Sequence, residues 1–266
     1  MLSSGVRRTA KAWTVLVLVF LYAPMLLVVV NAFNKSRTFS FPPREFTLRW
    51  WADTWQSSGM WTSLGNSVVV GLCATAIALV LGTMAAFAVQ RYDFFGRHTV
   101  SFLVVLPITL PGIVTGIALN ATFTSVLGVT LGLATVIVGH ATFCIVIVFN
   151  NTQARLRRLG TQLDDASADL GATPWQTFRY VTFPMMRGAL VASAILAFAL
   201  SFDEVVVTTF TAGPTVQTLP IWIFGNLSRP NQAPVINVVA AVLTVLAIIP
   251  VWLAQRFGGD PATTRV

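Results

Sequence analysis

Two adjacent acids, Asp203 and Glu204, lie inside an apolar part of the sequence, where ionisable side chains are costly and mark functional sites. They are flanked by Ala197-Phe198-Ala199-Leu200 and Val205-Val206-Val207. An acid in the wall of a membrane cavity attracts cationic solutes, whereas an acid between two helices holds them together through hydrogen bonds. Because successive helical residues point about 100° apart, we expect one acid to face a cavity and the other to pair with a neighbouring helix or a partner subunit.

His140 is a further ionisable side chain in an apolar stretch, Gly139-His140-Ala141-Thr142-Phe143. We predict a neutral histidine whose ring nitrogens are satisfied on a neighbouring helix. A proton-relay or gating role is the alternative.

The residues needed for several catalytic chemistries are missing. The two lysines, Lys11 and Lys35, lie outside any G-x-x-x-x-G-K-[ST] loop, so the chain cannot bind ATP by that device. The two histidines, His98 and His140, and two separate cysteines in apolar runs show no metal-ligand spacing. We therefore expect neither a cofactor nor a metal, and a chain that is not an enzyme.

The composition indicates a membrane protein. Of the 266 residues, 55% are hydrophobic and 10% are charged, against roughly 25% charged in a soluble domain, and the mean hydropathy is +0.76. A soluble globular enzyme and a disordered chain are both excluded by this balance. The net charge of +8 is better explained by membrane topology than by nucleic acid, which we do not expect as a partner.

Six stretches are long and apolar enough to cross the bilayer, which takes about 20 residues per helix. They are Ala12–Ala32, Asn66–Val89, Thr99–Leu119, Leu131–Phe149, Gly188–Phe210 and Val235–Ala254. The fold class predicted from them is an all-α integral membrane protein with six transmembrane helices. The first stretch exceeds the apolar core of a signal peptide, about 7–15 residues, so we interpret it as a membrane helix.

The basic residues predict the orientation. With a cytoplasmic N-terminus, 12 of the 17 lysines and arginines lie inside and 5 outside. This excess agrees with the positive-inside rule, so both termini are expected to face the cytoplasm.

Two helices have internal features of interest. The second span carries small residues mostly at spacings of four (Gly71, Thr75, Ala78, Gly82 and Ala86), which predicts a close packing face. The third span contains Pro107 and Pro111, which predict a kink or a local unwinding.

The longest cytoplasmic segment, Asn150–Arg187, has the pattern of two short helices joined at a glycine. Asp164 and Asp165 suit the positive end of the first helix, and Gly171 suits its left-handed stop. A solvated linker is the alternative interpretation.

The second short helix carries its own start signal. Thr173 and Gln176 form a T-x-x-Q capping box with Pro174 at the first helical position. Pro184 is expected to interrupt this helix just before the membrane. Together the two helices predict a compact elbow presented to the cytoplasm.

This elbow resembles the coupling motif of ABC importer permeases of type I. Asp165-Ala166-Ser167-Ala168-Asp169-Leu170-Gly171-Ala172, followed by Phe178, Val181 and Pro184, is similar to the family pattern of Glu-Ala-Ala, three residues, Gly and a later Pro. Asp165 stands where the family has glutamate, and Ser167 where it often has alanine. The resemblance implies a type I permease fold whose elbow docks into a cleft of a cytoplasmic ATPase. It assigns ATPase coupling to Asp165, Ala166, Ser167, Asp169, Gly171, Ala172 and Pro184.

The acidic segment resembles the spermidine/putrescine branch of these permeases. Ser201-Phe202-Asp203-Glu204, the following run to Gly213-Pro214, and Thr218-Leu219-Pro220 are similar to a pattern of two adjacent acids, a Gly-Pro turn and a Leu-Pro. The resemblance implies a polyamine or another small amine as the solute, with Asp203 and Glu204 on its path. It leaves related amines such as 4-aminobutyrate-like solutes open.

The resemblance also implies the assembly and the domain organisation. The chain would form half of a translocation path in the bacterial inner membrane, with a second homologous permease subunit, a dimer of ABC ATPase subunits, an external solute-binding protein and the lipid bilayer as partners. Residues 1–64 would hold an N-terminal helix and external segment, residues 65–254 the type I transmembrane domain, and residues 255–266 a cytoplasmic tail.

Two other functions are weighed against this one. A self-sufficient carrier could couple ions through Asp203, Glu204 and His140, but it would not need the cytoplasmic elbow. An intramembrane protease would need a membrane-embedded Ser–His pair or two catalytic aspartates on different helices. Asp203 is the only aspartate in the predicted spans, and no G-x-S-G sequence occurs.

Overall fold

The structure is a computed structural model that describes residues 4–229, 231–249 and 252. Within these residues every regular element is a helix, and β structure is confined to one isolated bridge between Asn34 and Phe46. The chain divides into two compact units. The first combines the described residues up to Met60 with Ile223–Ile249, and the second consists of Trp61–Trp222. Each unit is described by itself.

Four helical segments are long and apolar enough to cross a membrane, and a bent helix pair adds a fifth candidate. The four are α1 (Ser4–Asn31), α3 (Ser58–Arg91), α6 (Leu133–Leu159) and the continuous helix Pro174–Phe202. The sixth predicted span, Val235–Ala254, runs beyond the described residues, which hold the 14-residue helix α12 (Ala233–Leu246) of it. The predicted tail, residues 255–266, also lies outside the described residues.

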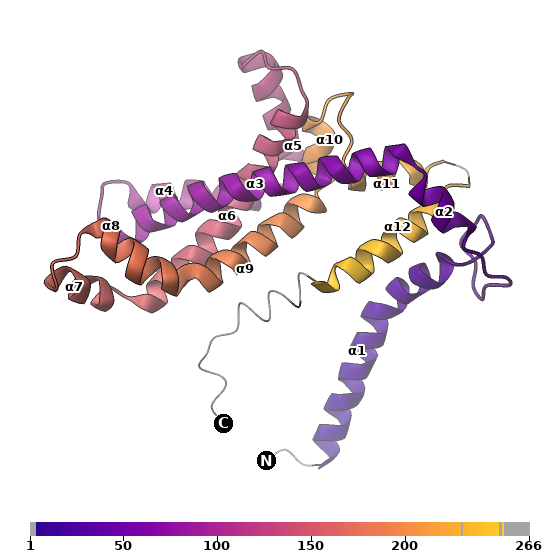
Figure 1. The fold of residues 1–266 in the computed structure, drawn as a ribbon, viewed down its shortest axis with the longest axis horizontal. Coiled ribbons are helices and arrows are strands. Elements are labelled where there is room, and N and C mark those ends of the chain that lie inside the picture. The colour runs from indigo at the N-terminus through magenta and orange to yellow at the C-terminus, as the bar shows by residue number, and fades with distance from the viewer. Residues whose placement is uncertain (1–3, 230, 250–251, 253–266) are drawn as a thin grey trace. The chain divides into compact units, whose positions relative to one another are not determined.

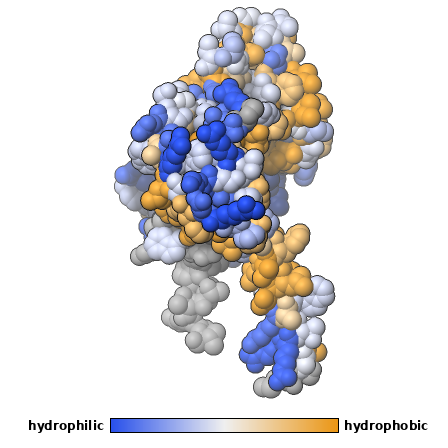
Figure 2. Space-filling view, turned by 90° about the vertical axis from the view of Figure 1, so that its right-hand side faces the viewer, coloured by the Kyte–Doolittle hydropathy of each residue, from blue (hydrophilic) through white to orange (hydrophobic). Residues whose placement is uncertain are grey.

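The first unit contains α1, α2 (Arg49–Trp55) and α12, shown in Figure 1. Its small core joins these helices through four buried residues, Ala32, Trp50, Val238 and Ala241. The free end of α1 is hydrophilic and is followed by an exposed hydrophobic stretch, visible in Figure 2. An exposed apolar surface of this length matches a helix surrounded by lipid or by another membrane subunit.

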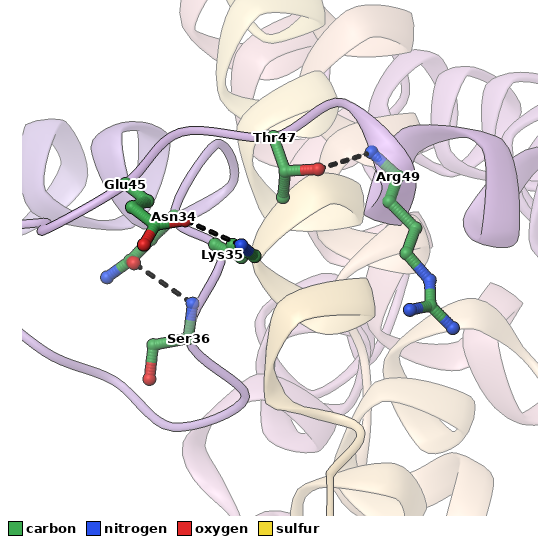
Figure 3. Close-up of polar contacts among 6 residues, drawn as sticks. All are labelled: Asn34, Lys35, Ser36, Glu45, Thr47 and Arg49. Atoms are coloured by element: carbon green, nitrogen blue, oxygen red, sulfur yellow. Dashed lines mark hydrogen bonds and ion pairs between the residues drawn. The ribbon is translucent and has the colours of Figure 1, made fainter.

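A polar segment connects α1 to α2, and Figure 3 shows its contacts. Lys35 and Glu45 form an ion pair with a distance of 2.6 Å between Nζ and Oε2. The Lys35 ammonium group lowers the pKa of the Glu45 carboxyl group, through the hydrogen bond first and the charge second. The Trp50 indole N–H donates to the Asn34 carbonyl over 2.9 Å. These contacts fix the segment against the start of α2.

The second unit is built around α6, whose side chains are largely buried. The core of this unit brings together α3, α6 and two later helices, Phe183–Phe202 and Val206–Thr211. It consists of six buried residues: Ala78, Phe143, Cys144, Val148, Ala197 and Val207. The predicted small-residue face of α3 is confirmed at Gly82, where a Cβ atom would lie 2.9 Å from the Ile145 carbonyl oxygen. Small residues therefore let α3 approach α6 backbone to backbone.

The third span is broken, as its prolines predicted. It consists of α4 (Arg97–Thr109) and α5 (Gly112–Ala121), which meet at an angle of 106°, and a π-helical turn (Thr122–Val126) extends α5. Pro111 lies at the break, while Pro107 lies inside α4. The break falls at the second proline because Leu110 takes an extended conformation, which proline favours in the residue before it.

The prediction for the fifth span was wrong in two respects. Pro184 does not interrupt the second helix of the elbow: α8 (Pro174–Thr177), a π-helical turn (Phe178–Thr182) and α9 (Phe183–Phe202) form one continuous helix. Pro184 follows the π-helical turn directly, and the changed hydrogen-bond spacing of that turn accommodates the N–H that proline lacks inside the helix. The span also does not continue to Phe210, because the helix ends at Phe202 and α10 (Val206–Thr211) begins after a break.

Candidate functional site

The first candidate site is the elbow. Its first helix, α7 (Gln162–Asp169), ends at Gly171, which has a φ of +81°. The Ala172 N–H donates to the Ser167 carbonyl over 3.1 Å, and the Gly171 N–H to the Ala168 carbonyl over 2.8 Å. This is the Schellman arrangement that satisfies the last carbonyls of a helix, and it requires a left-handed residue at Gly171.

The second helix of the elbow begins as predicted. The Gln176 N–H donates to Thr173 Oγ1 over 3.4 Å, and the Thr173 N–H donates to Gln176 Oε1 over 2.7 Å. Pro174 occupies the first helical position. The capping box and the glycine stop together fix the direction in which the chain reverses.

The two helices of the elbow are held together by polar contacts. The hydroxyl groups of Ser167 and Thr177 lie 3.0 Å apart, so Ser167 faces the second helix. The Thr182 hydroxyl donates to Asp164 Oδ1 over 2.9 Å.

Arg91, the last residue of α3, ties the elbow to the membrane helices. Its guanidinium group lies 2.5 Å from Asp164 Oδ2 and donates to the Gly160 carbonyl over 2.9 Å. The side chains of Arg91 and Asp164 are only 15% and 25% exposed. We call Arg91, Asp164 and Thr182 the latch. The latch joins α7 to α3 and to the helix that continues into α9.

The outer surface of the elbow is open. Leu170 is 90% exposed and Trp175 65% exposed, and Asp165, Ala166, Asp169 and Pro184 are also exposed. Apolar side chains that project from a rigid turn are available to a partner protein. Of the residues assigned to coupling, only Ser167 and Ala172 are partly buried.

The second candidate site is the break between α9 and α10, which contains both acids. Glu204 is partly buried, and its Oε1 accepts a hydrogen bond from the Val207 N–H over 2.9 Å. It thereby satisfies one of the unpaired N–H groups at the start of α10. Asp203 is exposed, and no hydrogen bond or ion pair holds its carboxylate within the part of the chain that the structure describes. The two acids are thus in a helix break, and not within a helix as expected.

His140 lies beside this break on α6 and is 1% exposed. Its Nδ1 lies 2.8 Å from Ser201 Oγ and its Nε2 lies 2.8 Å from Thr208 Oγ1. The prediction that both ring nitrogens are satisfied on a neighbouring helix is confirmed, with one partner on each side of the break.

Both broken spans meet in one place. Helices α5 and α10 lie side by side (Figure 1), and a Cβ atom on Gly116 would lie 2.6 Å from Phe210 Cδ2. The Asn120 side chain donates to the Phe210 carbonyl over 2.6 Å, and the Thr135 hydroxyl donates to the Thr211 carbonyl over 2.7 Å. Helix α10 is therefore fixed to α5 and α6, whereas the break before it is held by His140.

Sequence reasoning missed the roles of five residues in these sites: Arg91, Asp164, Thr182, Ser201 and Thr208. Asp164 has a sequence signal, since it precedes the coupling motif, but that signal predicts only a helix start. The other four lie far along the chain from their partners, so only the fold brings them together. Among the described residues, no three His, Cys, Asp or Glu side chains lie close enough to hold a metal ion.

Curated relatives match most of the chain. A putrescine transport system permease protein, PotI of Escherichia coli, is 32% identical over 87% of this chain and 85% of its own length. A spermidine/putrescine transport system permease protein, PotC of the same organism, is 30% identical over 91% of this chain and 90% of its own length. A putative 2-aminoethylphosphonate transport system permease protein, PhnV of Salmonella typhi, is 27% identical over 92% of this chain and 94% of its own length.

Solved structures share the fold. A chain of a bacterial ABC transporter involved in the import of alginate superposes with a TM-score of 0.73 at 15% identity, covering 97% of this chain and 99% of that one. A chain of the MetNI methionine ABC transporter in an inward-facing conformation superposes with a TM-score of 0.60 at 22% identity, covering 78% of this chain and 95% of that one.

The family assignment rests on the sequence match. The model of the binding-protein-dependent transport system inner membrane component family matches residues 78–258, which is more than half of the chain. The chain belongs to the family of binding-protein-dependent transport system inner membrane components.

Proposed function

We propose that this chain is the membrane-spanning permease subunit of an ATP-driven importer of polyamines, either putrescine and spermidine or a related small amine. The family makes it a multi-pass protein of the bacterial inner membrane. The observation that carries the solute class is the similarity to putrescine and spermidine/putrescine permeases, at 32% and 30% identity over 87% and 91% of the chain.

The exposed Asp203 carboxylate supports an amine as the solute. Alkyl amines are protonated near neutral pH, as the lysine side chain is with a pKa of about 10.4. Since Glu204 Oε1 accepts from the Val207 N–H, Asp203 is the acid that we assign to contact with the solute, and Glu204 supports the chain around it. A break in a membrane helix is a typical place for a transporter to bind its solute or a coupling ion.

The elbow supports coupling to a separate ATPase. We propose that Asp165, Ala166, Ser167, Asp169, Gly171, Ala172 and Pro184 form or shape the docking surface for one subunit of a cytoplasmic ABC ATPase dimer. Closure of that dimer would move α7, and the latch would carry the movement to α3 and α9. A second homologous permease subunit would complete the path, and an external solute-binding protein would deliver the amine.

The proposed topology has six spans with both termini in the cytoplasm, which places the elbow on the same side as the ATPase. The division into residues 1–64, 65–254 and 255–266 follows from it, with the N-terminal helix outside the domain shared by the family.

A self-sufficient ion-coupled carrier is not favoured, because it gives no role to the exposed elbow. A different solute is the more specific alternative, since PhnV is named as a putative 2-aminoethylphosphonate permease. That solute is also an amine, but it carries a phosphonate that Asp203 would repel.

The test is uptake of labelled putrescine, spermidine and 2-aminoethylphosphonate by cells that express the complete transporter, with and without this gene. We expect gene-dependent uptake of at least one polyamine that stops when cellular ATP is depleted at constant membrane potential. Gene-dependent uptake of the phosphonate alone would discard polyamines, and uptake driven by an ion gradient without ATP would overturn the importer assignment.

A further inference from the structure

We infer that His140 is a positioning residue for the solute path: it bridges the two helices on either side of the break at 203–205 and thereby fixes where the Asp203 carboxylate lies. This inference rests on the proposed function, in which Asp203 contacts the amine. It concerns a histidine that the coupling machinery does not use.

The hydrogen bonds determine the role of each ring nitrogen. The Thr208 hydroxyl donates its single proton to the Glu204 carbonyl over 2.7 Å. It can therefore only accept from His140, so Nε2 carries the ring proton in the 2.8 Å contact. In the neutral ring Nδ1 is then an acceptor, and the Ser201 hydroxyl donates to it. The result is one continuous chain of hydrogen bonds from Ser201 through His140 and Thr208 to the Glu204 backbone.

This run of hydrogen bonds begins before Asp203 in the sequence and ends after it. Ser201 lies two residues before Asp203 on α9, and the Glu204 carbonyl comes directly after it. Because no hydrogen bond or ion pair holds the Asp203 side chain among residues 4–229, 231–249 and 252, its position is set by the backbone on which it stands. His140 holds that backbone at its two ends.

Helix α6 is a suitable anchor for this function. It contacts α9 through the Cys144 thiol, which lies 3.4 Å from the Ala197 carbonyl, and it contacts α10 at Gly139, where a Cβ atom would lie 3.3 Å from Val207. The hydrogen bonds of a buried polar network act as a unit, and loss of one member leaves the others unsatisfied. Removal of the imidazole would leave Ser201 without its acceptor and would free the break while the packing of α6 remains.

The experiment is transport by the complete transporter in proteoliposomes, supplied with saturating binding protein loaded with either putrescine or spermidine. The rates are measured for the wild type, His140→Ala, Asp203→Asn and the double variant. We expect His140→Ala to alter the ratio of the putrescine rate to the spermidine rate by about fivefold to tenfold, the usual effect of a lost buried hydrogen bond. We expect Asp203→Asn to shift the ratio in the same direction, and the double variant to match Asp203→Asn alone.

Matched variants separate this role from general packing. Thr208→Val should reproduce His140→Ala, and Thr208→Ser should retain the wild-type ratio because it keeps the hydroxyl group. Ser193→Ala is the control, since the Ser193 hydroxyl bonds only the Ala189 carbonyl of its own helix among the described contacts.

The possible outcomes distinguish the two claims. If His140→Ala lowers both rates in proportion, or adds its effect to that of Asp203→Asn, His140 is a packing residue and this inference is overturned while the proposed function stands. If Asp203→Asn leaves both rates and their ratio unchanged, the proposed solute path is wrong and the inference fails with it.

Discussion

At the scale of single residues, Asp203 and Glu204 are neighbours with different environments. The Glu204 carboxylate accepts a backbone hydrogen bond at the start of α10, whereas the Asp203 carboxylate is exposed. Two adjacent charges would repel one another in a continuous helix within the membrane. The break lets Glu204 accept a hydrogen bond from the backbone and leaves the Asp203 carboxylate exposed, as the proposed contact with the solute requires.

Gly171 allows a test of the elbow at the same scale. A Cβ atom at this position would meet nothing within 4 Å, so any effect of substitution comes from its φ of +81° and not from a clash. A non-glycine residue in this conformation costs roughly 1–2 kcal/mol, and Asn tolerates it better than a β-branched residue. We predict that Gly171→Val abolishes transport and solute-stimulated ATP hydrolysis, whereas Gly171→Asn retains most of both, measured on equal amounts of assembled transporter. Normal uptake by Gly171→Val would refute the coupling assignment of the elbow.

At the scale of elements, the latch joins three segments that are far apart in the sequence. Asp164 receives hydrogen bonds or charge contacts from Thr182 and Arg91, and Arg91 also bonds the carbonyl of Gly160. The aromatic ring of Phe178 packs against Phe87 of α3 with 5.6 Å between the ring centroids. These contacts attach the elbow to α3 and to the helix that continues into α9, whereas a solvated linker would make no such contacts.

Loss of the latch should uncouple ATP hydrolysis from transport. Asp164→Ala leaves the partly buried guanidinium of Arg91 without its carboxylate, at a cost of about 1–3 kcal/mol. We expect fewer solute molecules moved per ATP hydrolysed, with the ATPase still bound. The measurement is the ratio of the two rates in proteoliposomes.

Asp93→Asn is the matched control for the latch, because the Asp93 side chain also pairs with an arginine, Arg97, but is 95% exposed. Exposed pairs contribute about 0–1 kcal/mol, so this variant should keep the wild-type ratio. An unchanged ratio in Asp164→Ala would show that the latch has no part in coupling.

The sequence was sufficient for those elements that carry local signals. The glycine stop at Gly171, the capping box at Thr173 and the break near Pro111 all come from residues whose backbone preferences act over one turn. The break at 203–205 was missed because no proline or glycine marks it. It is stabilised by His140 on another helix, and contacts between helices distant in the sequence cannot be inferred from local propensity. The same limit hid Arg91 and Thr182.

At the scale of the whole molecule, the proposed orientation places the elbow inside and the segment between α1 and α2 outside. It can be tested with single cysteines at exposed positions, after replacement of Cys73 and Cys144 by Ala. We predict that a membrane-impermeant maleimide added to intact spheroplasts labels Thr38→Cys and Val129→Cys, and labels Phe95→Cys and Leu170→Cys only after permeabilisation. Labelling in the reverse pattern would show that the topology is inverted, and it would place the elbow on the side of the membrane opposite to the ATPase.

The proposed coupling surface and the proposed solute contact lie in the same compact unit, Trp61–Trp222. The two sites share one continuous helix, Pro174–Phe202, which begins in the elbow and ends at the acid pair. A movement of the elbow therefore has a direct structural route to the residues proposed to contact the amine.

The measurement that tests this account most directly is ATP-dependent transport of labelled putrescine and spermidine into proteoliposomes that contain the complete transporter, with the wild type compared to Asp203→Asn. The account predicts ATP-dependent transport of at least one of these amines by the wild type, reduced about tenfold by the neutral variant, as for loss of a charged hydrogen bond of about 1.4 kcal/mol. Assembled wild-type transporter that hydrolyses ATP but moves neither amine, or transport that is unchanged in Asp203→Asn, would contradict it.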